Sequence, residues 1–161
     1  MNLTLIRRLT LLGVFAFVLA VGAPATASPP ALVSGTYTYT DSYFESFRTA
    51  GSNVIIGVVA SVEYTGTLTG ASIVRGTIIV HPDGSATFHN VEEFTGTVNG
   101  VPGTLTLRIA GSNDATLDVH AKSIIVDASG GLAGLHGTLA LAGSVRFPQG
   151  PFGTYSGRLG S

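Results

Sequence analysis

The chain has 161 residues, with 8 Lys and Arg against 9 Asp and Glu, 22 Gly, and neither Cys nor Trp. The absence of cysteine excludes disulfides, thiolate zinc sites, iron–sulfur clusters and a cysteine nucleophile. Charged residues make up only 11% of the chain, and its formal net charge is −1. The near-zero net charge argues against a nucleic-acid-binding protein, because such proteins need a concentrated basic surface. The length and composition predict one compact, weakly charged domain.

The N-terminus has the organisation of a secretory signal peptide. Arg7 and Arg8 precede an apolar run over residues 9–21, and the small-residue triplet Ala25-Thr26-Ala27 follows. The run is shorter than the roughly 20 apolar residues that span a bilayer. We therefore expect residues 1–27 to be removed by cleavage between Ala27 and Ser28. The product would be a secreted protein with no integral membrane span.

The rest of the chain alternates apolar and polar residues in short runs, which is typical of β-strands, and no stretch keeps a helical period. Residues 28–33 are expected to form a linker and residues 34–161 one domain. For residues 41–50 two alternatives stay open, a helix or an extended edge segment, of which the extended segment is favoured. The expected strands are 34–40, 58–69, 73–81, 85–98, 104–110, 116–127, 138–147 and 153–159.

About eight strands joined by short turns predict an all-β fold, a single eight-stranded antiparallel β-barrel. Turn signals such as Pro82-Asp83-Gly84 and Asn99-Gly100 separate the strands. A flat sandwich is the alternative. Glycines within the strands favour the barrel, because tight corners need residues without a Cβ. These glycines are Gly66, Gly76, Gly96, Gly143 and Gly157.

Glycine motifs recur over residues 35–160. They are Tyr64-Thr65-Gly66-x-Leu68-x-Gly70, Pro82-Asp83-Gly84, Phe88-x-x-x-Glu92-x-Phe94-x-Gly96 with Gly100 and Gly103, Leu107-x-x-x-Gly111, and Gly131-Leu132-x-Gly134-Leu135-x-Gly137. Together they resemble a family of small bacterial domains of unknown function, similar in fold to allene oxide cyclase and the plant dirigent proteins. The resemblance implies an eight-stranded barrel whose cavity shelters hydrophobic substrates during cyclisation or coupling, without metal or organic cofactor. Ile109 departs from the family pattern, where many members have a polar residue, and makes the interior more apolar.

Glu92 is the most informative candidate site residue. Strand alternation puts it on one face with Phe88, Asn90 and Phe94, and the two phenylalanines indicate that this face is the core. A buried carboxyl has a raised pKa unless it is paired, and a raised pKa suits a general acid or base. The alternative is a structural role, with Glu92 neutralised by Arg75 or by tyrosine hydroxyls.

Tyrosines are the other candidates, because each offers an apolar body and a polar tip. They either shape a small-molecule pocket around Glu92 or serve as core residues that hydrogen-bond across strands. The full set of predicted ligand-binding residues is Tyr37, Tyr39, Tyr64, Arg75, Glu92, Phe94 and Tyr155.

The four histidines, at positions 81, 89, 120 and 136, are scattered without ligand spacing, so neither a metal nor another cofactor is expected. The sequence predicts a secreted barrel that binds a small hydrophobic molecule. Any chemistry would be a cofactor-free isomerisation or cyclisation, with Glu92 as the best catalytic candidate. The alternative is a non-catalytic module with a filled core that acts through its exterior. The weakly charged surface also suggests a homo-oligomer.

Overall fold

The computed structural model describes residues 29–146 and 150–161. The expected signal peptide, residues 1–27, and its cleavage site lie outside these residues. The described chain forms β1 (Ala31–Ala50), β2 (Asn53–Gly66), β3 (Leu68–Val80), β4 (Ala86–Val98), β5 (Val101–Asn113), β6 (Asp118–Gly130), β7 (His136–Ser144) and β8 (Phe152–Gly160).

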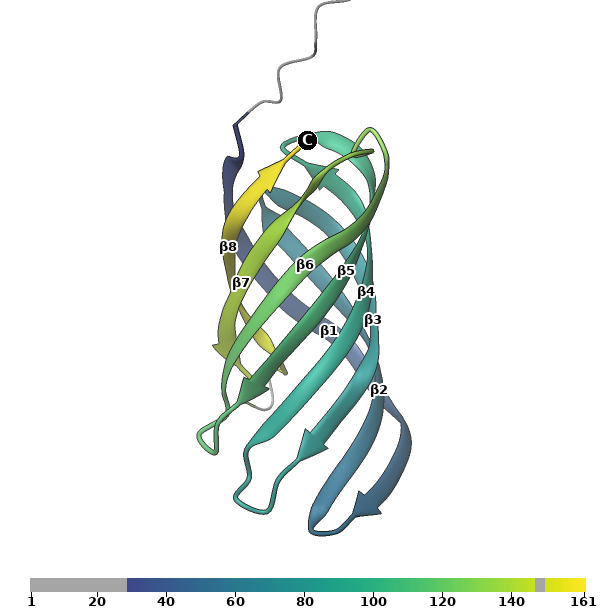
Figure 1. Ribbon diagram of the computed structural model, residues 1–161, viewed down its shortest axis with the longest axis vertical. Coiled ribbons are helices and arrows are strands. Elements are labelled where there is room, and N and C mark those ends of the chain that lie inside the picture. The colour runs from purple at the N-terminus through teal and green to yellow at the C-terminus, as the bar shows by residue number, and fades with distance from the viewer. Residues whose placement is uncertain (1–28, 147–149) are drawn as a thin grey trace, which may run out of the picture.

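Each strand pairs antiparallel with its neighbour in the chain, and β8 pairs back with β1 to close the sheet into a barrel (Figure 1). The predicted all-β fold of eight antiparallel strands is therefore confirmed, and the ring closure replaces the flat-sandwich alternative. Within the described residues no helix has the length and apolarity needed to cross a membrane.

Strand β1 is longer at both ends than the sequence suggested. It begins at Ala31, inside the segment 28–33 expected as a linker, because Ala31–Val33 pair with Gly157–Leu159 of β8. It also runs through residues 41–50, which pair with β2 as far as Ala50 and Asn53. The helical alternative for that segment is wrong, and the extended alternative is confirmed. The β1–β2 hairpin extends beyond the other strands at the lower end of Figure 1.

A tight turn splits the expected strand 58–69 into the end of β2 and the start of β3. Gly66 ends β2 with a φ of +100°, a conformation that residues with a Cβ rarely adopt. The N–H of Thr67 then donates to the carbonyl of Ser34 at 3.0 Å, which ties the turn to β1. Tyr64 and Leu68 remain on the buried side, so the turn preserves the alternation that the sequence displays.

Large side chains fill the barrel at the end that carries the β2–β3, β4–β5 and β6–β7 turns, the upper end in Figure 1. Leu68, Phe94, Leu105 and Tyr155 are at most 2% exposed there. We call these four residues the plug. Their burial removes apolar surface from water, which is the main source of stability in such a core.

A row of four glycines crosses the barrel wall beside the plug. Gly70, Gly96, Gly103 and Gly130 are consecutive partners on β3, β4, β5 and β6. A Cβ on Gly96 would lie 2.8 Å from the ring of Phe94. The missing Cβ of Gly96, one of the glycines expected within the strands, therefore lets the Phe94 ring lie close against the wall.

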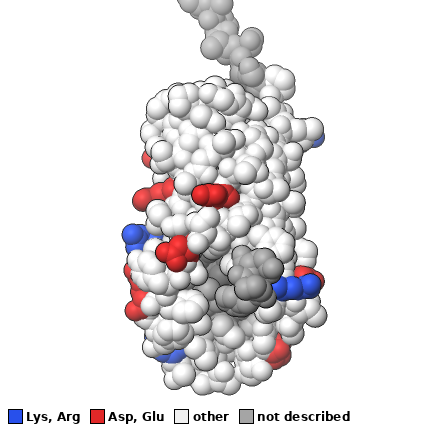
Figure 2. Space-filling view, turned by 180° about the vertical axis from the view of Figure 1, so that it is seen from behind, with Lys and Arg blue, Asp and Glu red and all other residues white. Residues whose placement is uncertain are grey.

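The outer surface carries little charge. Figure 2 shows the barrel from behind; on this face most Lys, Arg, Asp and Glu lie below the upper third, where charged groups are visible only at the edges. The low charged fraction of the chain, 11%, is the cause.

Candidate ligand-binding cavity

The barrel is hollow below the plug. The hollow has a volume of about 330 Å³ and extends to the lower end of the barrel, where the turns after β3, β5 and β7 contribute Gly84, Leu117 and Val145 to its rim. Most of its wall is apolar and comes from seven strands, β1 to β7; the apolar lining residues include Val58, Val74, Ile78, Phe88, Ile109, Val119 and Leu141. The barrel is therefore filled at one end and hollow at the other.

Glu92 lies at the inner end of this hollow, against the plug. Its side chain is 1% exposed. One carboxyl oxygen accepts a hydrogen bond from the Tyr64 hydroxyl at 3.1 Å, and the other accepts one from the Ser72 hydroxyl. The three residues come from β4, β2 and β3 respectively, which are neighbours in the sheet. Alternation places each of them inward, so their convergence follows from register.

Burial raises the pKa of Glu92 above its ordinary value, and the hydrogen bonds from Ser72 and Tyr64 oppose that shift without cancelling it. Burial, and next the nearby Glu92, also raise the pKa of Tyr37 to about 12. The same two causes raise the pKa values of Tyr39 and Tyr64. The three tyrosine hydroxyls therefore stay protonated at neutral pH and act as hydrogen-bond donors or acceptors.

Four of the seven predicted site residues line the hollow: Tyr37, Tyr39, Tyr64 and Glu92. The tyrosine rings form a connected group, with centroids of Tyr37 and Tyr39 at 6.3 Å and of Tyr37 and Tyr64 at 6.4 Å. These separations are typical of favourable aromatic pairs. The structure thus places the predicted carboxyl and three of the predicted tyrosines around one cavity.

Two further predicted residues, Phe94 and Tyr155, lie in the plug, on the other side of Tyr64 from the hollow. Phe94 packs edge-on against the ring of Tyr64 with centroids 5.8 Å apart, and Tyr155 does so at 5.6 Å. The Tyr155 hydroxyl accepts the N–H of Leu68 at 2.7 Å. Both residues support the floor of the cavity, and their contacts are those of the core-packing alternative.

Arg75 is the predicted residue that the structure places outside the barrel. Its neighbour Val74 points inward and is 1% exposed, so Arg75 points outward. Its guanidinium lies 3.6 Å from the Glu45 carboxylate, and 63% of its side chain is exposed. The partners of Glu92 are therefore the hydroxyls of Tyr64 and Ser72, and not Arg75, because adjacent residues of a strand face opposite sides of the sheet.

Ser72 and Asn90 belong to the cavity region, and sequence reasoning did not select either as a site residue. Ser72 is buried and bonded to Glu92, and Asn90 lines the cavity wall. The available signal was strand alternation, since Asn90 is two residues from Glu92 and Ser72 is two residues from Val74. Alternation predicts which side of the sheet a residue faces. It does not predict the position of that residue along the barrel axis, and this position decides which inward side chains come into contact.

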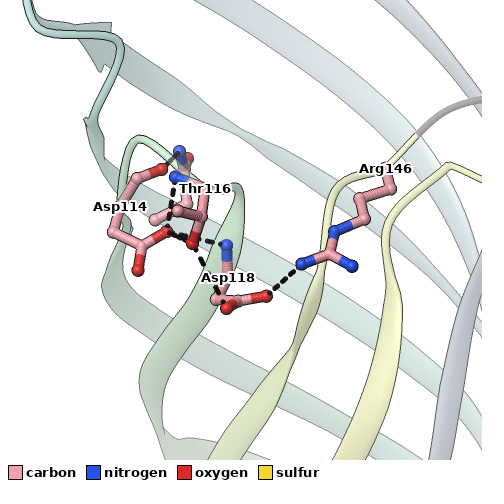
Figure 3. Close-up of polar contacts among 5 residues, drawn as sticks. Asp114, Thr116, Asp118 and Arg146 are labelled. Carbon is pink, nitrogen blue, oxygen red and sulfur yellow. Dashed lines mark hydrogen bonds and ion pairs between the residues drawn. The ribbon is translucent and has the colours of Figure 1, made fainter.

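The turn between β5 and β6 gives the cavity rim a fixed shape (Figure 3). The Asp114 carboxylate accepts the N–H of Thr116 at 2.9 Å and the N–H of Asp118 at 3.0 Å. Arg146 pairs with Asp118 at 3.1 Å and joins the ends of β6 and β7. Leu117 adopts a φ of +70°, unusual for a residue with a Cβ, and lines the cavity. The hydrogen bonds of Asp114 hold it there.

In the part of the chain that the structure describes, no three His, Asp or Glu side chains come together as a set of metal ligands. His81 lies beside the cavity rim and forms a hydrogen bond with the Asn53 amide oxygen at 3.3 Å.

A protein-family model described as "Protein of unknown function (DUF3224)" matches residues 33–145. The chain belongs to the DUF3224 family. The match runs from β1 to the end of β7 and includes every residue of the cavity except Pro151. It confirms the expected membership of a bacterial domain family without assigned function.

A solved DUF3224 structure has the same fold. It is a protein of unknown function from Shewanella oneidensis MR-1, 20% identical, with a TM-score of 0.61, and the alignment covers 81% of this chain and 96% of that one. At this identity the likeness establishes the DUF3224 fold alone. No curated protein matches the chain.

Proposed function

We propose that this DUF3224 protein is a secreted bacterial barrel that binds a small, largely apolar molecule in the hollow below its plug. The observation that carries the proposal is the 330 Å³ cavity with apolar walls and the Glu92, Tyr64 and Ser72 hydrogen bonds at its inner end. Ligand pockets in proteins are mostly apolar clefts of about 300–1,000 Å³ with a few placed polar groups. The hollow meets both criteria.

The barrel core is filled at one end and hollow at the other, and this difference supports ligand binding over the alternative of a non-catalytic module with a filled core. The plug residues are almost fully buried, whereas Phe88, Ala121 and Tyr39, which face the hollow, are only partly buried. A barrel selected for stability alone gains by filling such space, because each unfilled methyl-sized void costs stability. Selection for stability therefore does not explain why this part of the core is left unfilled.

A catalytic form of the proposal takes its chemistry from the likeness to allene oxide cyclase noted above, a cofactor-free isomerisation or cyclisation. Glu92 would move a proton to or from the bound molecule, since a carboxyl with a raised pKa is matched to that task near neutral pH. Tyr37 and Tyr39 would orient the substrate with their hydroxyls. Binding is the primary proposal, and turnover is tested after a ligand is known.

Self-association through the outer wall is a separate part of the proposal. Val91 on β4 and Ile124 and Val126 on β6 are outward-facing and between 43% and 47% exposed. Arg108 is the register partner of both Val91 and Ile124, so it lies between them on this surface. Exposed apolar side chains grouped in this way favour contact between copies of a chain.

The test is native mass spectrometry of the protein from its own host's culture medium, followed by solvent extraction. We expect a reproducible apolar molecule to be released on denaturation, and the same spectrum reports the oligomer. Ala121→Phe, which fills the hollow, should release nothing. Ala140→Phe on the exposed outer wall is the matched control and should keep the ligand. A clean mass, unchanged after exposure to a panel of lipophilic compounds, would reject the proposal.

A further inference from the structure

We propose that self-association produces a closed dimer, in which Arg108 of each copy pairs with Glu93 of the other across a two-fold axis. This inference rests on the self-association proposed above and specifies how the two outer walls meet. It does not depend on ligand binding in the hollow.

The outer wall of β4, β5 and β6 carries apolar side chains and both signs of charge close together. Val91, Arg108 and Ile124 are consecutive register partners and form one row across the three strands. Glu93 and Thr106 are register partners in the next row towards the plug. Arg108 and Glu93 are both exposed, so both are accessible to another chain.

The two charges lie side by side on this wall. Glu93 is two residues beyond the register partner of Arg108, a diagonal position at which residues on adjacent strands lie about 7–8 Å apart. The described part of the chain has two ion pairs, and neither includes Glu93 or Arg108. An adjacent acid and base are complementary to a surface that presents the same two charges in reverse order. A second copy of the chain presents them in that order when it is turned around.

A two-fold axis can relate two such walls in two ways, and the charges distinguish them. An axis along the strands sets the row of Arg108 against the same row of the second copy, which contains no acid. An axis along the rows exchanges neighbouring rows, so Arg108 faces Thr106 of the second copy and lies beside its Glu93. Opposite charges attract, so the axis along the rows is favoured. Symmetry then repeats the pair of Arg108 and Glu93 on the other side of the axis.

The same arrangement brings exposed apolar side chains of the two walls together. Val126 lies at a β-bulge of β6, between the partners of Thr106 and Leu107. Across an axis along the rows, Val126 meets Ile124 of the second copy, and both side chains are exposed in one chain alone. Ile124 also lines a shallow depression in this wall. Burial of these apolar groups drives association, and the ion pairs fix its orientation.

An anionic lipid surface or a polyanion fits this wall less well than a second copy does. Either of them presents negative charge to the whole wall. Arg108 would attract it, but Glu93 beside Arg108 would repel it. A surface that carries both signs of charge avoids this repulsion, and the chain itself is such a surface.

The test is sedimentation velocity of the wild type and of charge variants over a range of protein concentrations. We expect the wild type to form dimers and nothing larger, because a two-fold contact uses the same face of both copies. Arg108→Glu should raise the dimer dissociation constant about tenfold or more, since it replaces each attraction with a repulsion. Arg108→Glu combined with Glu93→Arg should restore the dimer, because the exchanged charges are again complementary.

Arg158→Glu is the matched control for Arg108→Glu. It makes the same change of charge at an exposed position of β8, outside the proposed contact. The control should form dimers as readily as the wild type does. The size of the wild-type assembly tests the two-fold symmetry without any variant.

The outcomes separate this inference from the proposal on which it rests. A wild type that stays monomeric at every concentration rejects self-association and this inference with it, and leaves ligand binding untouched. A dimer that Arg108→Glu does not weaken overturns this inference and leaves self-association intact. Failure of the double variant to restore the dimer overturns the pairing with Glu93. Growth into larger assemblies overturns the closed two-fold contact.

Discussion

The hydroxyl of Tyr155 accepts the backbone N–H of Leu68 at 2.7 Å and donates to the carbonyl of Thr65 at 3.1 Å. These bonds join β8, the last strand, to the turn between β2 and β3. Leu68 is fully buried, so water cannot replace the hydroxyl. These hydrogen bonds stabilise the end of the barrel that the plug fills, and they lie outside the cavity.

Tyr155→Phe should destabilise the protein by about 1–3 kcal/mol, because it leaves the buried Leu68 N–H unpaired while keeping the ring. Ligand affinity should not change, since Tyr155 does not line the cavity. Urea denaturation and ligand titration measure the two quantities. Tyr37→Phe is the control, because the described residues provide no partner for its hydroxyl. An equal loss of stability in both variants would contradict the assignment.

Glu92→Gln should change how stability depends on pH. The folded state raises the Glu92 pKa above its ordinary 4.5, so it holds the proton more tightly than the unfolded chain does. The contribution of Glu92 to the free energy of unfolding of the wild type is therefore fully present below pH 4.5, and it is lost as pH rises through the folded-state pKa. Glutamine cannot ionise, so over that window the free energy of unfolding of the variant should rise relative to that of the wild type by about 1.4 kcal/mol for each pH unit.

The measurement for Glu92→Gln is the free energy of unfolding of both proteins, determined in urea at a series of pH values. The difference between them isolates Glu92, because all other titrating groups are shared. A difference that stays constant with pH would show that Glu92 ionises in the folded protein as readily as in the unfolded chain.

Gly143→Ala should destabilise the barrel and weaken ligand binding together. A Cβ at this inward position would lie 2.7 Å from the Tyr37 hydroxyl and 2.8 Å from the Cα of Gly153. The backbone of β8 cannot move far, so the strain should cost about 1–3 kcal/mol and displace Tyr37 toward the hollow. Thr154→Ala, at an exposed position of β8, is the control. Thermal unfolding and dye binding follow the two effects, and a neutral Gly143→Ala would disprove the close packing.

Asp114→Asn should make the rim turn less stable, with an effect that disappears in acid. The hydrogen bonds that Asp114 accepts, first from the Thr116 hydroxyl, lower its pKa below the ordinary 3.8. A lowered pKa means that the stabilisation is present above pH 3.8 and is lost as pH falls through the folded-state value. The melting temperature of wild type should exceed that of the variant near neutrality, and the two should converge in acid.

Asp127→Asn is the matched control for the rim turn, because Asp127 makes no hydrogen bond or ion pair through its side chain within the described residues. It should melt like the wild type at every pH. A gap between wild type and Asp114→Asn that persists in strong acid would mean that the carboxylate charge is not what holds the turn.

The fold was predictable to the level of strand count and direction, because those properties are local. Alternation marks strands and Asn99-Gly100 marks a hairpin, whatever the rest of the chain does. The same alternation placed Glu92, Tyr37 and Tyr64 inward correctly. It was uninformative at Arg75, because residues 73–80 are apolar on both faces apart from this arginine and Thr77, and an inward arginine looked as plausible as an outward one.

The start and end of strands were predicted less well where pairing between distant segments decides them. Ala31–Val33 are part of β1 because β8 lies beside them, more than 120 residues later in the chain. The turn at Gly66 exists because Ser34 of β1 accepts the Thr67 N–H. Neither partner can be identified from the local sequence.

The sequence by itself determined which side chains face inward, because successive residues of a strand point to opposite sides of the sheet. The tertiary structure alone decided how far along the barrel axis each of them lies. Closure of a tilted sheet sets the register of every strand pair at once, and this register puts Tyr155 in the plug but Tyr37 on the cavity wall. It also brings Tyr64 and Ser72 to Glu92 and leaves Asn90 beside Gly76, facing the hollow. The chemistry of the site is a property of that register.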